Sequence, residues 1–224
     1  MSYNYLPLDK NPTSFQQVKN LLAFNQLVSI TFDAHHRIKA CREYLDKKLC
    51  KGNELFYGIN TGFGYLQNVK IDNAQLQELQ INLIKSHACG LGEEVPEDIV
   101  KLMIMLKIKS LSYGNSGVQT DTVKRLMDMY NNNVLPVIYT QGSLGASGDL
   151  APLSHLSLAL IGLGEVYHEG KKMQAAAVLQ KFNWQPLLLQ SKEGLALING
   201  TQFMSAYGMH CLIQCDRLLQ WANI

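Results

Sequence analysis

The chain has 224 residues, of which 47% are hydrophobic, enough for a sizeable core in one large domain or two modest ones. Its formal net charge is +2 and it has no run of about five like charges, so we expect no nucleic-acid partner and no membrane partner. The polar N-terminus lacks the pattern of a signal peptide, and no apolar stretch reaches the roughly 18 residues of a membrane span.

Cysteine usage indicates the redox compartment. The five cysteines are odd in number, and no pair has Cys-x-x-Cys spacing. Cys211 and Cys215 lie four residues apart in an apolar stretch, so we expect them on one buried helix face. No group of His, Cys, Asp and Glu has the spacing of metal ligands. The pattern favours reduced thiols in a cytoplasmic protein without a metal site.

Helical periodicity dominates the chain, which has no internal repeat or low-complexity segment. In the first half the pattern predicts, in order, a helix from a Thr13 cap to Phe24, a strand over 27–32, a helix from an Asp33 cap to Leu49, a short strand before a glycine loop at 57–64, and a helix from Asn73 to His87. In the second half it predicts helices from Pro96 to Gly114, from Thr120 or Asp121 to Asn131, from Leu150 to Gly162 and from Gly200 to Trp221, and a hairpin turning at Glu169–Gly170.

The last predicted helix is still running at Trp221, without a glycine, a proline or a polar tail. We therefore expect the chain to be the front part of a longer one. The alternative is a short protein whose last helix docks on a partner.

The stretch GSLGASGDLAPLSH, residues 142–155, places small residues directly before an apolar helix. If the amide nitrogen of Gly148 attacks the carbonyl carbon of Ala146, a five-membered ring closes. Loss of one water completes the ring, and loss of a second from Ser147 leaves an exocyclic methylidene. Glycine has no Cβ to block this approach. The electrophile would need no exogenous cofactor.

The surroundings of this tripeptide are also informative. Asp149 can cap the following helix or position the cyclising backbone, and the N-terminal dipole of that helix favours negative charge at the ring. We expect His155 to be packed or capping rather than catalytic. On the tripeptide alone, a plain Gly/Ser turn with a helix cap remains the simpler interpretation.

Three further segments of the sequence contain candidate residues for the site. In YGINTGFG, residues 57–64, Gly62 and Gly64 belong to a loop that can fold over a site, with Tyr57 as a base; a plain turn with a core tyrosine is the alternative. His87 falls on the apolar face of its predicted helix, where a satisfied core histidine is the alternative. Asn199 precedes a glycine, a pair usually found in turns.

Together these segments resemble the aromatic amino-acid ammonia-lyases, which cyclise this tripeptide. The resemblance spans fourteen consecutive residues at 142–155 and extends to YGINTGFG, LIKSHACGLGEEVP, LKIKSLSYGNSGVQ and GLALINGTQ. It covers nearly all of the chain but only the front part of the family's length. It implies a mainly α, ammonia-lyase or fumarase–aspartase-like fold, truncated here. A small mixed α/β region with the mobile tyrosine loop (residues 1–112) would lead into a long helical bundle (113–224).

The resemblance also implies roles for the candidate residues. Ala146, Ser147 and Gly148 would form 4-methylidene-imidazol-5-one, Tyr57 would remove a β-proton, and Asn199 would hold the electrophile or the substrate amine. The stretch LIKSHACGLGEEVP, which contains His87, resembles the histidine-specific branch of the family. In that branch, His87 would meet the substrate imidazole. The implied reaction is elimination of ammonia from L-histidine to give trans-urocanate, in a homotetramer that binds a small-molecule amino acid.

Two alternatives stay open. One is a tyrosine ammonia-lyase or aminomutase with the same electrophile, since some tyrosine-specific members also have histidine at the position of His87. The other is a non-catalytic helical fragment, in which the last helix would leave apolar side chains uncovered: Leu212, Leu218, Leu219 and Trp221. Because the family's later substrate-binding residues lie beyond this chain, we expect the 224-residue chain alone to be inactive.

Overall fold

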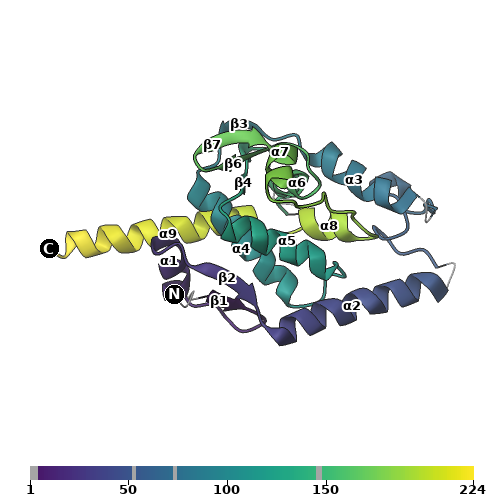
Figure 1. The fold of residues 1–224 in the computed structure, drawn as a ribbon, viewed down its shortest axis with the longest axis horizontal. Coiled ribbons are helices and arrows are strands. Elements are labelled where there is room, and N and C mark those ends of the chain that lie inside the picture. Colours follow the sequence, from purple (N-terminus) through teal and green to yellow (C-terminus); the bar gives the residue numbers. More distant parts are fainter. Residues whose placement is uncertain (1–4, 52–53, 73–74, 145–147) are drawn as a thin grey trace.

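The computed structural model describes residues 5–51, 54–72, 75–144 and 148–224, and most of them are helical (Figure 1). The helices are α1 (Phe15–Ala23), α2 (Phe32–Lys51), α3 (Leu76–His87), α4 (Glu97–Ser112), α5 (Thr120–Asn131), α6 (Leu150–Leu160), α7 (Ala175–Lys181), α8 (Glu193–Ile198) and α9 (Gln202–Ala222). The strands are β1 (Tyr5–Leu8), β2 (Leu27–Ile30), β3 (Leu91–Glu94), β4 (Leu135–Pro136), β5 (Tyr139–Gln141), β6 (Glu165–His168) and β7 (Lys171–Gln174). The prediction of a mainly α fold is confirmed.

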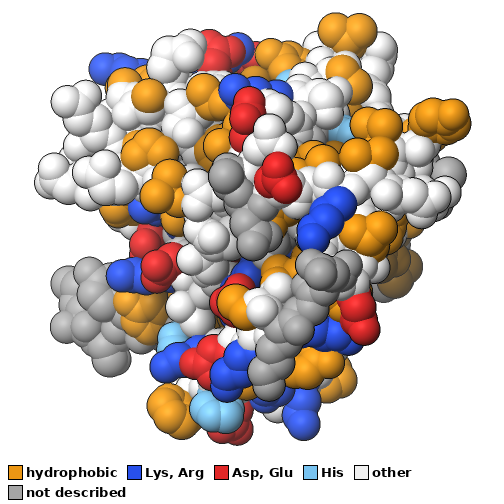
Figure 2. Space-filling view, turned by 90° about the vertical axis from the view of Figure 1, so that its right-hand side faces the viewer, with side chains coloured by type: hydrophobic (Ala, Val, Ile, Leu, Met, Phe, Trp, Pro, Cys, Tyr) orange, Lys and Arg blue, Asp and Glu red, His pale blue; other side chains and the backbone are white. Residues whose placement is uncertain are grey.

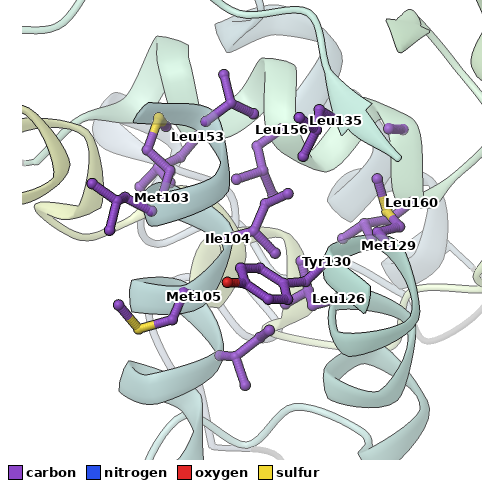
Figure 3. Close-up of a cluster of buried hydrophobic side chains, with 14 of the residues drawn as sticks. Met103, Ile104, Met105, Leu126, Met129, Tyr130, Leu135, Leu153, Leu156 and Leu160 are labelled. Carbon is purple, nitrogen blue, oxygen red and sulfur yellow. The ribbon is translucent and has the colours of Figure 1, made fainter. Parts of the chain in front are cut away.

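Helix α4 forms the centre of the molecule. Helix α4 carries buried, mostly apolar side chains on nearly all of its faces, which is the pattern of a helix buried in a core. It packs against α5 and α9. Figure 3 shows side chains of α4 meeting side chains of α5 and α6 in one cluster: Met103, Ile104, Met105, Leu126, Met129, Tyr130, Leu153, Leu156 and Leu160. This core includes residues on both sides of position 112, and the division into 1–112 and 113–224 stays a prediction.

In the described part of the chain, the strands form three small sheets. Strands β1 and β2 pair in parallel through the crossover helix α1, with Leu6 opposite Val28. Strands β3 and β5 pair antiparallel. Strand β6 lies between β4 and β7, and the predicted β6–β7 hairpin turns at Glu169 and Gly170 as expected. Both turn residues have positive φ, as a two-residue hairpin turn of type I′ requires.

Several predicted helix starts are shifted. Ser14, not Thr13, caps α1, because its hydroxyl accepts from Gln17 N and the Gln17 side chain accepts from Ser14 N in a capping box. Thr31, not Asp33, caps α2, with its hydroxyl accepting from Ala34 N at 3.2 Å. For α5 the N-cap position is Gln119, so Thr120 and Asp121 lie inside the helix.

Two other expectations about elements have different outcomes. The strand expected before the glycine loop does not form; residues 54–63 adopt turns that lead into a short 3-10 helix, Gly64–Leu66. Asn73, the expected start of the helix that becomes α3, lies outside the described residues.

The second half of α9 extends away from the body of the molecule (Figure 1). Cys211 and Cys215 are therefore exposed, and the expectation that they share a buried helix face is wrong. The apolar side chains named above on this helix are uncovered as expected: Leu212, Leu218, Leu219 and Trp221. None of the helices in the described part of the chain is long and apolar enough to cross a membrane.

Candidate active site

Gly148 stands two residues before the first residue of α6 and lies against the turn that joins α8 to α9. Its φ of +103° is a backbone conformation that residues with a side chain rarely adopt. A Cβ at Gly148 would lie 2.6 Å from the carbonyl oxygen of Gly200 and 2.9 Å from its nitrogen. Only glycine fits between these two backbone segments. Its neighbours in the predicted ring, Ala146 and Ser147, lie outside the described residues.

Asp149 links three segments at this junction. Its backbone N–H donates to Gly200 O at 2.7 Å, and its buried carboxylate accepts from the Ser143 hydroxyl at 2.7 Å and from Met204 N at 3.0 Å. The carboxylate makes no side-chain cap for α6. It instead satisfies a free N–H in the first turn of α9, where the helix dipole favours negative charge. Asp149 thus joins the segment of Gly148 to Gly200 and to the start of α9. Its side chain does not cap α6, and a role in positioning the cyclising backbone stays a prediction.

Lys107 is a buried lysine close to this junction that sequence analysis missed. Its side chain projects from α4 and donates to Ala196 O, near the C-terminal end of α8, at 3.0 Å. Burial lowers the pKa of Lys107 to about 7, and the charge of Asp149 opposes this shift. The available signal was a lone lysine inside the apolar run of residues 102–108.

The glycine loop lies over α8. A Cβ at Gly58 would lie 2.6 Å from the Leu195 side chain, so the loop approaches this helix closely. The Tyr57 ring packs edge-on against Phe63, and its hydroxyl accepts from Gly64 N at 3.4 Å. The Tyr57 side chain is nevertheless 58% exposed. A Cβ at Gly62 would lie 2.6 Å from the Cβ of Leu66, so Gly62 also has no room for a side chain.

His87 ends α3 with a defined tautomer. Its Nδ1 lies 2.9 Å from Leu83 O, and a carbonyl oxygen can only accept, so Nδ1 must carry the proton. The Ser86 hydroxyl lies 3.1 Å from the same nitrogen. In the neutral imidazole, this tautomer leaves Nε2 as an acceptor. His87 is half-buried at the edge of the apolar face that carries Leu83.

Helix α8 is the element around which these residues gather. Helix α3, which carries His87, is tied to it by the bond from Gly194 N to Gln80 Oε1 at 2.9 Å. Asn199 is exposed and directly follows α8, one residue before the Gly200 contact with Gly148. The structure therefore joins Gly148, Asp149 and the Asn199–Gly200 turn through direct contacts. It brings the segments of Tyr57 and His87 to the same short helix.

The surface around this region has no dominant charge. Figure 2 shows the side of the molecule that lies to the right in Figure 1, where α3 and the end of α2 are found. Side chains of both charge signs are interspersed there with hydrophobic ones. Within the described ranges, no three His, Cys, Asp or Glu side chains are grouped so that they could hold a metal ion.

The chain is similar to several known proteins over most of its length. Histidine ammonia-lyase from Staphylococcus aureus (strain bovine RF122 / ET3-1) is 46% identical over 213 residues, which cover 95% of this chain and 42% of that protein. The crystal structure of histidine ammonia-lyase from Trypanosoma cruzi matches with a TM-score of 0.83 and 36% identity, over 93% of this chain and 40% of that one. Tyrosine aminomutase from Streptomyces globisporus matches with a TM-score of 0.83 and 32% identity, over 91% and 38%.

The chain thus spans about two fifths of the length of the curated relatives it matches. The sequence model described as aromatic amino acid lyase matches residues 13–224, which is nearly the whole chain. The chain belongs to the aromatic amino acid lyase family.

Proposed function

We propose that these residues belong to a histidine ammonia-lyase, a carbon–nitrogen lyase that converts L-histidine to trans-urocanate and ammonia. The observation that carries the proposal is the orientation of His87, whose Nδ1 donates to Leu83 O and whose Nε2 faces away from that bond, where it can meet a substrate N–H. The Staphylococcus aureus relative, named a histidine ammonia-lyase, supports the same substrate. The proposal includes a cytoplasmic homotetramer.

We further propose that Ala146, Ser147 and Gly148 cyclise within this chain. Residues around the tripeptide fit such a ring, because Gly148 is held at a positive φ in a cradle that a Cβ would fill. The contacts that hold it come from Asp149 and Gly200, both of which this chain contains. When formed, the methylidene-imidazolone supplies an electrophile that turns the substrate amine into a leaving group.

The chain's own side chains then have distinct tasks. His87 Nε2 accepts from the imidazole N–H of the substrate and orients the ring. Tyr57 is the base that takes the β-proton while the amine departs, so that the proton and the leaving group come from neighbouring carbons. Asn199 hydrogen-bonds the reacting amine or the electrophile, and the N-terminus of α6 stabilises negative charge beside Gly148. With Tyr57 58% exposed, the glycine loop must close over the site before it can reach a substrate.

A second candidate function is that of a tyrosine-specific enzyme of the same family, an ammonia-lyase or an aminomutase. The observation that favours it is again His87, because an acceptor nitrogen serves a phenolic O–H as well as an imidazole N–H. The structural similarity to tyrosine aminomutase from Streptomyces globisporus supports it further.

Products from L-histidine and L-tyrosine, assayed side by side, distinguish these functions. The assay uses a longer polypeptide, in which residues 1–224 are followed by a segment that corresponds to the rest of the relatives' length. This polypeptide is expected to yield urocanate from histidine and no product from tyrosine. Replacing Tyr57 by Phe, which keeps the ring contact with Phe63 but removes the base, is expected to lower kcat by at least about 100-fold. Coumarate or β-tyrosine as the main product would overturn histidine as the substrate.

The 224-residue chain by itself is expected to give no urocanate. Tyr57 and Asn199 are open to solvent in this chain, and elimination requires a site that excludes water. Turnover by the isolated chain at a rate near that of the longer polypeptide would contradict this expectation.

A further inference from the structure

We propose that His155 is a positioning residue that fixes the segment following His87 to helix α6, by accepting a hydrogen bond that imidazolium is unable to accept. The significance for substrate binding rests on the role proposed for His87. The hydrogen bond between Gly90 N and His155 Nε2 is independent of that role.

The bond joins two parts of the chain that are distant in sequence. His155 lies in the second turn of α6, the helix that directly follows the predicted ring, and its Nε2 lies 3.0 Å from the backbone nitrogen of Gly90. A backbone N–H can only donate, so Nε2 is the acceptor and carries no proton. Gly90 stands three residues after His87, in the short link between α3 and β3. The imidazole thus connects the end of the His87 helix to the helix behind Gly148.

The segment around Gly90 is closely enclosed. A Cβ at Gly90 would lie 3.0 Å from His155 Nε2 and 3.3 Å from Gln141 O. A Cβ at Gly142 would lie 3.1 Å from Gly90 Cα, and Leu91 pairs with Gln141 in the β3–β5 ladder. The segment around Gly90 is therefore held between residues 141–142, which precede the tripeptide, and helix α6, which follows it.

The surroundings of His155 favour its neutral form. Burial lowers the pKa of His155, and the ring of Tyr139 from β5 meets the imidazole edge-on at 5.2 Å between centroids. Two further titratable residues, His87 and Cys89, lie on the segment that carries Gly90. When His155 is protonated, its Nε2–H faces the N–H of Gly90, and the bond is lost.

The proposal predicts a coupling between His155 and the position of His87. Losing the bond is expected to free the link that follows α3, while the core contacts of α6 remain. Substrate affinity is then expected to fall more than the rate of the chemical step.

Two substitutions separate positioning from packing. His155→Gln places a neutral amide oxygen near the position of Nε2, and it does not titrate. His155→Leu keeps apolar bulk but has no acceptor. The primary readout is hydrogen exchange at Gly90 N–H in the folded protein, with Val95 N–H as the internal control. Val95 donates to Ile138 O at 2.8 Å in the same region but does not contact His155 through that bond.

In the wild-type protein, exchange at Gly90 relative to Val95 is expected to rise by at least about tenfold as His155 is protonated in acid. The His87 ring shifts are expected to show the same titration step. His155→Gln should retain protection and lose the step, and His155→Leu should exchange fast at every pH. Equal Gly90 protection in all three proteins would overturn the proposal, as would a glutamine variant as unprotected as the leucine variant with Val95 unchanged.

The same pair of variants gives a kinetic test in the longer polypeptide. His155→Leu is expected to raise KM for histidine about tenfold with kcat within a factor of about three, and His155→Gln to restore most of the affinity. Equal losses of kcat in both variants, with KM unchanged, would contradict the positioning role. Because the exchange readout needs no substrate, failure of the His155 proposal and failure of the proposed reaction are distinguishable.

Discussion

The free energy of unfolding is expected to rise by about 2 kcal/mol between pH 7 and pH 9 through Lys107 alone. Burial lowers the pKa of Lys107 to about 7 in the folded chain, whereas an unfolded lysine titrates near 10.4. Between these two values the unfolded state binds a proton that the folded state does not. Raising the pH removes this advantage of the unfolded state, so stability increases through the window and levels off above it. Below about pH 7 both states bind the proton, and the contribution becomes constant.

Urea unfolding at pH 7, 8 and 9 measures this effect. Lys107→Met keeps the apolar stem but has no titrating group, so its stability is expected to lack the Lys107 part of the rise. Lys39→Met is the matched control, because Lys39 lies on α2 with its side chain 64% exposed. That control is expected to follow the wild-type pH dependence. If the free energy of unfolding rose equally with pH in the wild type and in Lys107→Met, the low pKa of the buried Lys107 would be refuted.

Gly148→Ala is expected to destabilise the protein by about 3 kcal/mol and to prevent ring closure. The added Cβ would lie 2.6 Å from Gly200 O, a backbone atom that cannot rotate away, and φ is +103°. Overpacking of this kind costs about 1–3 kcal/mol, and an alanine at positive φ costs roughly 1–2 kcal/mol more. Denaturant unfolding measures the loss of stability, and intact mass shows whether the ring has closed.

Gly170→Ala separates the two costs. Gly170 has φ of +70° in the β6–β7 turn, and a Cβ there would meet nothing within 4 Å. It is expected to lose only about 1 kcal/mol, which is the cost of the backbone conformation without a clash. If Gly148→Ala were no less stable than Gly170→Ala, the close contact between Gly148 and Gly200 would be wrong.

The elements that the sequence predicts well are those with strong local signals. Pro96 starts α4 as expected, since its fixed φ suits a helix start, and the Glu169–Gly170 turn forms where two residues tolerate positive φ. The cap of α1 was misplaced by one residue because Thr13 and Ser14 are both good caps, and only the reciprocal bond from Gln17 selects Ser14. Short strands such as β3 and β5 were missed because each depends on its distant partner rather than on its own pattern.

The candidate site shows the same division. Local pattern was enough to single out the tripeptide and the glycine loop. It did not reveal that the Asp149 carboxylate caps α9, because Met204 lies 55 residues further along the chain. Lys107 and His155 were missed or assigned to packing for a similar reason: Ala196 and Gly90, which they contact, are brought to them only by the tertiary fold. Cys211 and Cys215 were predicted as buried because periodicity identifies an apolar face but not what covers it.

The intact mass of the folded 224-residue chain tests the central claim most directly. Closure of Ala146, Ser147 and Gly148 into the methylidene-imidazolone removes two water molecules, so the account predicts a mass about 36 Da below that of the unmodified sequence. Ser147→Ala has no hydroxyl to eliminate and is expected to lack the second dehydration. A folded wild-type chain with the full unmodified mass would contradict the claim that this fold builds its own electrophile.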